Sequence, residues 1–129
     1  MERQEDIEIY VSGKETGTLE AWLGEALVDF AVTRREKNQV PAQATGDDGS
    51  TLSILLIANV SRSGYSSLWI KENNSPWDTD LACAQAAYDS LQCNIRCTAG
   101  GWSEQDEEDL WWQVNASGVQ QVSWQLERN

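Results

Sequence analysis

The chain has 129 residues, 40% of them hydrophobic, and this length and composition predict one folded domain over residues 1–129. The formal net charge of −12, from 21 acidic and 9 basic residues, argues against nucleic acids and membranes as partners, because both bind through Lys and Arg that neutralise phosphate. The chain has no histidine, which excludes Ser-His-Asp and Cys-His catalysis and His-ligated zinc.

Signals for export or membrane insertion are missing from the sequence. No apolar run approaches the roughly 20 residues that cross a bilayer. Residues 1–6 are charged and lack the apolar stretch of a secretory signal. We therefore expect a soluble, cytoplasmic protein, and we expect no disulfide framework from its three cysteines.

The first predicted elements are a strand over 7–11, where every second residue is apolar, and then a helix capped by Thr18. The end of this helix is left open. It either continues to Arg34 and Arg35, whose charges would suit the helix dipole, or it ends near Leu27 so that residues 28–32 form a strand. The apolar stripe that predicts the helix consists of Leu19, Trp22, Leu23, Ala26, Leu27 and Phe30.

The middle of the sequence predicts strands separated by turns. Residues 38–50 are polar and rich in turn formers, so we expect a loop or an irregular hairpin there, with a turn at Asp48-Gly49. Residues 51–60 predict a strand that is apolar on both faces, which is typical of a strand inside a sheet. Residues 67–72 predict the next strand.

The second helix is predicted to follow Ser75, which would be its N-cap with Pro76 in the first helical position. A short strand is expected over residues 94–98. The side chains that the helix is expected to bury are Trp77, Leu81, Ala84, Tyr88 and Leu91.

The last predicted element is a β-hairpin with a three-residue turn over 116–118. Its register pairs residue 114 with 120 and residue 112 with 122. Trp111 then shares a face with Gln113 and Gln121. The opposite, apolar face carries Leu110, Trp112, Val114, Val122 and Trp124.

Together these elements predict an α+β fold. We expect a two-layer sandwich in which two helices pack on one face of a mainly antiparallel sheet of about five or six strands. The sheet is expected to end in the C-terminal β-hairpin.

The cysteines predict no reactive or metal-binding site. Cys93 and Cys97 share the apolar face of a predicted strand at a separation of roughly 13 Å, too far for a disulfide, and are expected in the core. Cys83 lies off the apolar stripe of its helix and has no evident activating base. Residues 13–17 lack the spacing of a phosphate-binding loop. We therefore predict no catalytic residue, no metal and no cofactor.

Tryptophan and acidic residues supply the candidate binding site. The chain has seven tryptophans, and Trp102 and Trp111 flank a segment with five acids in six residues. Tryptophan beside charge is typical of an interface anchor, although packing inside the fold explains the same positions equally well. The predicted partner-binding residues are Trp102, Glu104, Asp106, Glu107, Glu108, Asp109 and Trp111.

Two functional hypotheses follow. The first is a non-catalytic protein–protein interaction module, of inhibitor, immunity or regulatory type, whose acidic, Trp-bearing surface binds a basic protein. The second is a small-molecule-binding domain or enzyme with a pocket between sheet and helices, lined by aromatic residues, carboxylates and Arg62 or Arg96. Solubility or a salty habitat is the simpler explanation of the acidity itself. A monomer and a homodimer both remain open.

Overall fold

The computed structural model describes residues 4–13, 15–98 and 110–124. These residues form an α+β fold with helices and strands in the order that the sequence predicts, plus further strands. The elements are β1 (Ile7–Ser12), α1 (Thr16–Ala26), β2 (Val28–Val32), β3 (Gln39–Thr45), β4 (Thr51–Ile57), β5 (Tyr65–Ile70), α2 (Asp80–Leu91), β6 (Ile95–Thr98), β7 (Leu110–Asn115) and β8 (Gly118–Ser123).

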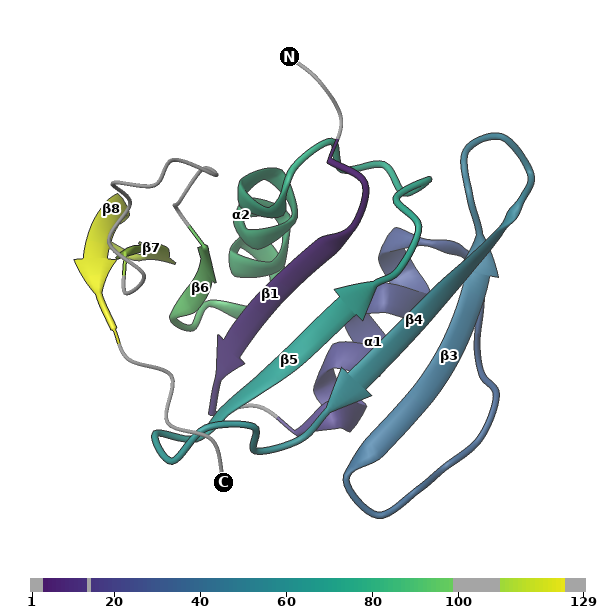
Figure 1. The fold of residues 1–129 in the computed structure, drawn as a ribbon, viewed down its shortest axis with the longest axis horizontal. Coiled ribbons are helices and arrows are strands. Elements are labelled where there is room, and N and C mark those ends of the chain that lie inside the picture. Colours follow the sequence, from purple (N-terminus) through teal and green to yellow (C-terminus); the bar gives the residue numbers. More distant parts are fainter. Residues whose placement is uncertain (1–3, 14, 99–109, 125–129) are drawn as a thin grey trace.

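The strands form one eight-stranded sheet in the order β2-β3-β4-β5-β1-β6-β7-β8, and neighbouring strands are antiparallel (Figure 1). The fold class is confirmed, but the predicted strand count was too low. The missed strand is β3, because its inward residues Ala42 and Ala44 give a weak apolar signal and Pro41 argues against a strand.

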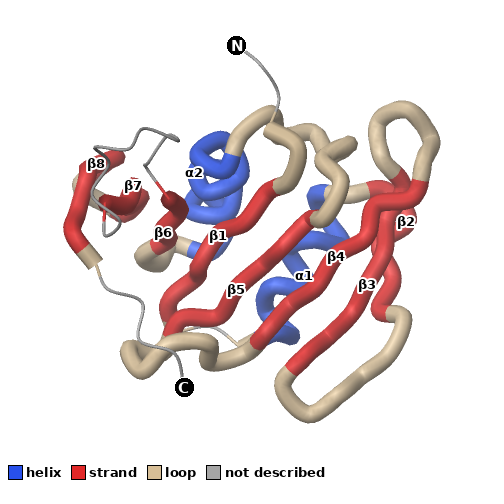
Figure 2. The backbone as a smooth tube through the Cα atoms, in the orientation of Figure 1, coloured by secondary structure: helices blue, strands red, loops and turns tan. Residues whose placement is uncertain are grey.

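Both helices cover the same face of the sheet (Figure 2). The buried core between the layers takes alternate residues from the strands, such as Ile7, Ile9 and Val11 of β1. β4 lies in the sheet interior between β3 and β5, as its two apolar faces predict. Within the described residues, no helix is both long and apolar enough to cross a membrane. The other face of the sheet carries neither of the described helices, and we call it the open face.

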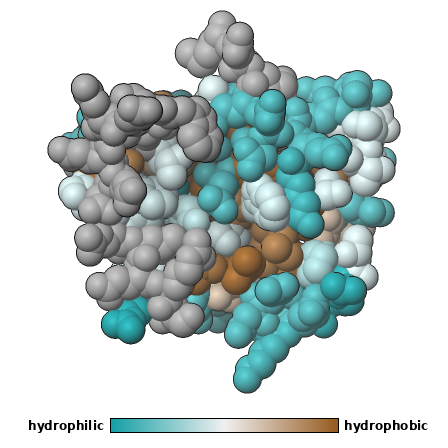
Figure 3. Space-filling model, in the orientation of Figure 1, coloured by the Kyte–Doolittle hydropathy of each residue, from teal (hydrophilic) through white to brown (hydrophobic). Residues whose placement is uncertain are grey.

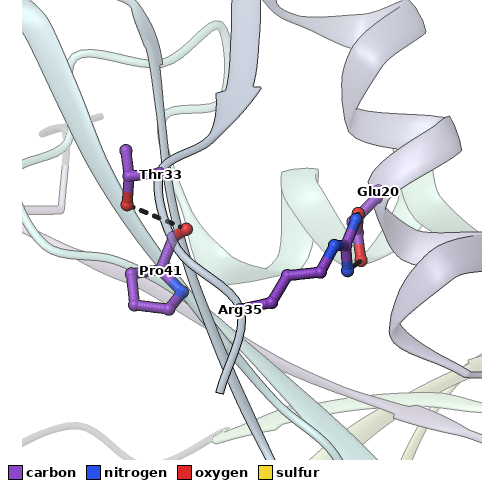
Figure 4. A network of polar contacts seen from close by, with 4 residues as sticks. All are labelled: Glu20, Thr33, Arg35 and Pro41. Atoms are coloured by element: carbon purple, nitrogen blue, oxygen red, sulfur yellow. Dashed lines mark hydrogen bonds and ion pairs between the residues drawn. The ribbon is translucent and has the colours of Figure 1, made fainter.

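Helix α1 follows the shorter of the two predicted alternatives. It ends at Ala26, and Leu27 is already extended, with φ −119° and ψ 151°. The expected Thr18 cap is wrong, since Thr18 lies inside the helix and Glu15 takes the N-cap position without a side-chain hydrogen bond. The dipole role expected for Arg35 is also wrong. Its guanidinium instead donates to the carboxylate of Glu20 at 2.6 and 3.2 Å (Figure 4).

Helix α2 starts later than predicted. Its N-cap is Thr79, whose hydroxyl accepts a hydrogen bond from the Ala82 N–H at 3.1 Å. The Ser75 hydroxyl accepts instead from the Trp77 N–H at 3.2 Å, so it closes a separate turn before the helix. The buried face also differs from the predicted stripe, because it is centred on Cys83, Ala84 and Ala87. Cys83 is fully buried on it, contrary to the prediction that it lies off the apolar side.

The C-terminal hairpin is confirmed, but its register is shifted by one residue. Asn115 pairs with Gly118 and Trp111 pairs with Val122, because the connecting turn is one residue shorter than predicted. The Asn115 side chain accepts from the Ser117 N–H at 2.9 Å, and Gly118 takes a φ of 103° that suits glycine. The shift places Trp111 and Val122 together on the open face.

Candidate functional site

Trp111 belongs to a second hydrophobic cluster, on the open face of the sheet. This aromatic cluster consists of Tyr10, Val60, Tyr65 and Trp111, with Ile57, Val122 and Trp124 packed against it. Four strands, β1, β4, β5 and β7, carry residues of both this cluster and the opposite, helix-covered core. The sheet is therefore buried on both sides around β1.

The rings of the aromatic cluster pack mainly edge to face. The Trp111 ring lies 5.3 Å from Tyr10 and 4.8 Å from Trp124, centroid to centroid. The Arg96 guanidinium lies 4.7 Å from the Trp124 ring and 5.0 Å from the Tyr65 ring, and its Nε donates to Gln113 at 2.9 Å. These contacts combine ring packing with cation–π attraction, so the cluster stabilises the fold.

The structure buries Trp111, whereas the sequence was compatible with either an exposed interface anchor or a packed residue. Only 6% of its side chain is exposed, so the packing explanation holds for this residue. Its indole Nε1 has no hydrogen-bond partner among the described residues. The other predicted partner-binding residues, Trp102, Glu104, Asp106, Glu107, Glu108 and Asp109, lie outside the described residues.

Three segments far apart in the sequence, residues 4–6, 47–48 and 72–78, meet at the end of the sheet where β1 starts and β5 ends. The Gln4 N–H donates to Asp78 O at 2.7 Å, and the Asn73 N–H donates to Glu5 O at 2.8 Å. The Asp47 N–H donates to Asn74 O at 2.9 Å. We call this region the acidic end, because its exposed side chains include Glu5, Asp6, Asp47, Asp48, Glu72 and Asp78.

Charge is distributed unevenly along the strands. Among the described residues, the cation at the acidic end is Lys71, which directly follows the last residue of β5. Four of the six described cations lie at the opposite end, in the β2–β3 connection (Arg34, Arg35, Lys37) and in the β4–β5 turn (Arg62). These two connections are neighbours, because the Ala58 N–H donates to Asn38 O at 2.9 Å. Two of these cations are paired with carboxylates, Arg34 with Glu36 and Arg35 with Glu20, so the charge asymmetry of the described residues comes mainly from the negative charge of the acidic end.

A tryptophan lies where the acidic end meets the open face. Trp69 is half-buried on β5, and its indole N–H donates to the Asp6 carboxylate at 2.9 Å. The Lys71 ammonium lies 5.3 Å from the centre of its ring. Figure 3 shows this face, with hydrophilic residues over most of its upper part and a hydrophobic patch below its centre. Among the residues that this face leaves partly exposed are Leu55 and Ile57 of β4.

Hydrogen bonds hold the Asp48 carboxylate in place. The bonds from Ser50, followed by the bond from Asn74, lower the pKa of Asp48 below its ordinary value. Asp48 therefore stays charged to lower pH than an isolated aspartate. The turn that sequence analysis places at Asp48-Gly49 is confirmed, with φ 87° at Gly49.

Gly46 lies against the loop that carries Asn74. A Cβ atom at residue 46 would lie 2.8 Å from Asn74 O, which is closer than non-bonded atoms approach. We expect Gly46→Ala to destabilise the fold by about 1–3 kcal/mol because the backbone must move. Gly24→Ala is the control: it meets nothing within 4 Å in a helix, and should stabilise by about 0.5–1 kcal/mol. Urea unfolding of both variants tests this prediction. Equal changes in the free energy of unfolding for the two variants would contradict it.

The buried titratable groups lie between α2 and the sheet. Asp80 accepts from the Glu8 N–H at 2.9 Å, and burial raises the pKa of its carboxyl. Burial also raises the pKa of the Cys97 thiol to about 12 and that of the Cys83 thiol well above its ordinary value. Both thiols are therefore protonated near neutral pH and are poor nucleophiles. Cys93 is half-buried against the core.

The described residues contain a cleft but no candidate metal-binding cluster. In residues 4–13, 15–98 and 110–124, no group of three or more Cys, Asp or Glu is placed to hold a metal ion. A cleft of about 480 Å³ lies between the β1–α1 loop and the β4–β5 turn. Its lining residues are Gly13, Glu15, Thr16, Ala58, Asn59, Gly64 and Ser66, with Glu15 as the acid.

Comparison with protein-family models, with curated proteins and with solved structures finds no match to this chain.

Proposed function

We propose that this protein is a non-catalytic interaction module that binds a basic protein through the acidic end and Trp69, as an inhibitor, immunity or regulatory protein would. The observation that carries the proposal is the segregation of charge. Exposed carboxylates from three distant segments gather at one end of the sheet, while most of the described cations lie at the other.

Segregated charge suits recognition of a basic surface. A field of one sign at one end accelerates association and orients the partner during approach. Trp69 adds a large half-buried ring beside these carboxylates, and tryptophan is enriched among the residues that dominate binding energy. The bonds from Ser50 and Asn74 to Asp48 hold part of this surface in a fixed shape before binding.

The alternative hypothesis, a ligand-binding domain or enzyme, has less support. It needs a pocket between the sheet and the helices, but the described core side chains pack into that space. Arg96, which we considered as a lining residue, lies on the open face in contact with Tyr65 and Trp124. Arg62 lies in the β4–β5 turn. The acidic segment 104–109 stays a predicted part of the binding surface.

Two charge-matched variants test the proposal. Asp47→Asn with Glu72→Gln removes two exposed carboxylates of the acidic end. Glu25→Gln with Asp89→Asn removes two exposed carboxylates of the helices. Each tagged protein is incubated with native lysate at low and moderate salt, and retained proteins are identified by mass spectrometry. Basic proteins retained by the wild type should be lost from the first variant and kept by the second.

Trp69→Ala provides a further arm of the experiment. We expect it to weaken binding of a retained basic protein by roughly thirtyfold or more, as loss of an interface anchor does. Recovery of no basic protein at either salt concentration would contradict the proposal. Equal losses from the two charge-matched variants would also contradict it, because binding would then depend on net charge alone.

A further inference from the structure

The two edges of the sheet differ in how they are protected against pairing with another strand. At the β2 edge, Asp29 adopts a left-handed conformation with φ 56°, and the pairing with β3 shifts register between Val28 and Ala31. A bulge and an acidic side chain on an edge strand are features that prevent edge-to-edge association. The β2 edge is therefore blocked.

The β8 edge has none of these features. Its sequence, Gly-Val-Gln-Gln-Val-Ser, contains no charge and no proline, and its pairing with β7 is continuous from Leu110–Ser123 to Asn115–Gly118. β8 ends the strand order, so its outer side pairs with none of the other described strands. All of its residues are exposed except Val122, which is half-buried, and Val119 is 39% exposed. β8 is thus a regular edge strand with accessible backbone groups.

The charge distribution indicates which partner fits this edge. Residues 110–124 contain no charged residue, although 23% of the whole chain is charged. Two copies of a protein with net charge −12 repel each other, and the repulsion is smallest where neither copy presents carboxylates. Among the described residues, the β7–β8 hairpin is such a surface.

We propose that β8 pairs antiparallel with β8 of a second copy, joining two sheets into one continuous sheet. A two-fold axis perpendicular to the sheet makes the contact self-complementary, because each copy supplies the same backbone donors and acceptors. The open faces of the two copies then lie on the same side. The symmetry requires one residue of β8 to lie opposite its own counterpart, and the two registers with the longest overlap of Gly118–Ser123 place Gln120 or Gln121 there.

Sedimentation equilibrium over micromolar to millimolar concentrations tests the proposal. The wild type is expected to form dimers as concentration rises. Gln120→Glu with Gln121→Glu places like charges across the two-fold axis in either register, so it should raise the dimer dissociation constant at least tenfold. The control is Gln39→Glu with Gln43→Glu, which makes the same change in charge at exposed positions of β3 and should leave the constant nearly unchanged.

Disulfide cross-linking gives a second measurement that does not depend on charge. Of the single variants Gln120→Cys and Gln121→Cys, one is expected to form a disulfide-linked dimer readily under mild oxidation, and it identifies the register. A wild type that stays monomeric at every concentration overturns the proposal. A dimer that both glutamate variants weaken equally, or that neither cysteine variant traps, also overturns it, because another surface must then hold the two copies together.

Discussion

Replacing Trp111 by alanine is expected to lower the free energy of unfolding by about 3–5 kcal/mol, which is a large part of the roughly 5–15 kcal/mol that stabilises a typical domain. Trp111 is 6% exposed and contacts the rings of Tyr10 and Trp124. Its removal leaves a cavity and deprives both neighbours of an edge-to-face partner. Chemical unfolding followed by far-UV circular dichroism measures the loss.

Trp111→Phe separates packing from hydrogen bonding at this position. The indole Nε1 makes no hydrogen bond to the described residues, so phenylalanine loses mainly ring area. We expect a loss smaller than for alanine by about 2 kcal/mol or more, since most of the buried ring remains. If Trp111→Ala were nearly as stable as the wild type, the structural role of Trp111 would be contradicted. Trp111 would then again be a candidate surface anchor for a partner.

The sequence analysis placed Trp111 on the correct face of its strand but put Val122 and Trp124 on the opposite face, and this error has a simple physical cause. In a hairpin, a change of one residue in the length of the turn moves every side chain of the second strand to the other face. The prediction chose the register that separates polar from apolar residues, which assumes that one face of the sheet is exposed. The structure buries side chains on both faces near β1, so the assumption fails there. Sequence periodicity has no means of showing a second cluster.

The main elements were predictable because their signals are local. Alternation identified β1, and a run of apolar residues on both faces identified β4 as an interior strand. The apolar stripes predicted both helices correctly, but the residues at which the helices begin were predicted incorrectly. Ser75 and Thr79 are both good caps, and tertiary contacts of the preceding loop decide between them: the Asp80 N–H, for example, donates to Gln4 at 2.6 Å.

The acidic end was not predictable from the sequence. Its carboxylates come from residues as far apart as Glu5 and Asp78, in short groups that look ordinary along the chain. The topology of the sheet brings them together, because β1 starts where β5 ends. The acidic run at 104–109 is evident in the sequence because its acids are consecutive. The charge asymmetry of the described residues becomes evident only when the order of the strands in the sheet is known.

Trp22→Ala is expected to have the second large effect on stability, about 3–5 kcal/mol. Trp22 of α1 and Trp77, in the turn before α2, are both buried, as the sequence predicts. Their rings are stacked, with centroids 5.3 Å apart and an angle of 22° between the planes. This pair joins α1 to the segment that leads into α2, so its loss loosens the helical layer as well as leaving a cavity.

A double-mutant cycle isolates the contribution of the stack itself. Trp22→Leu, Trp77→Leu and the double variant are unfolded in urea, and the sum of the two single losses is compared with the double loss. We expect the sum to exceed the double loss by about 0.5–1.5 kcal/mol, the range found for aromatic pairs beyond their buried area. Pairing Trp22→Leu with Val114→Ala, a buried residue of β7 in the same core, is the control. Additive losses at Trp22 and Trp77 would show that the two rings stabilise the fold independently, and the layer would then depend on burial rather than on their mutual contact.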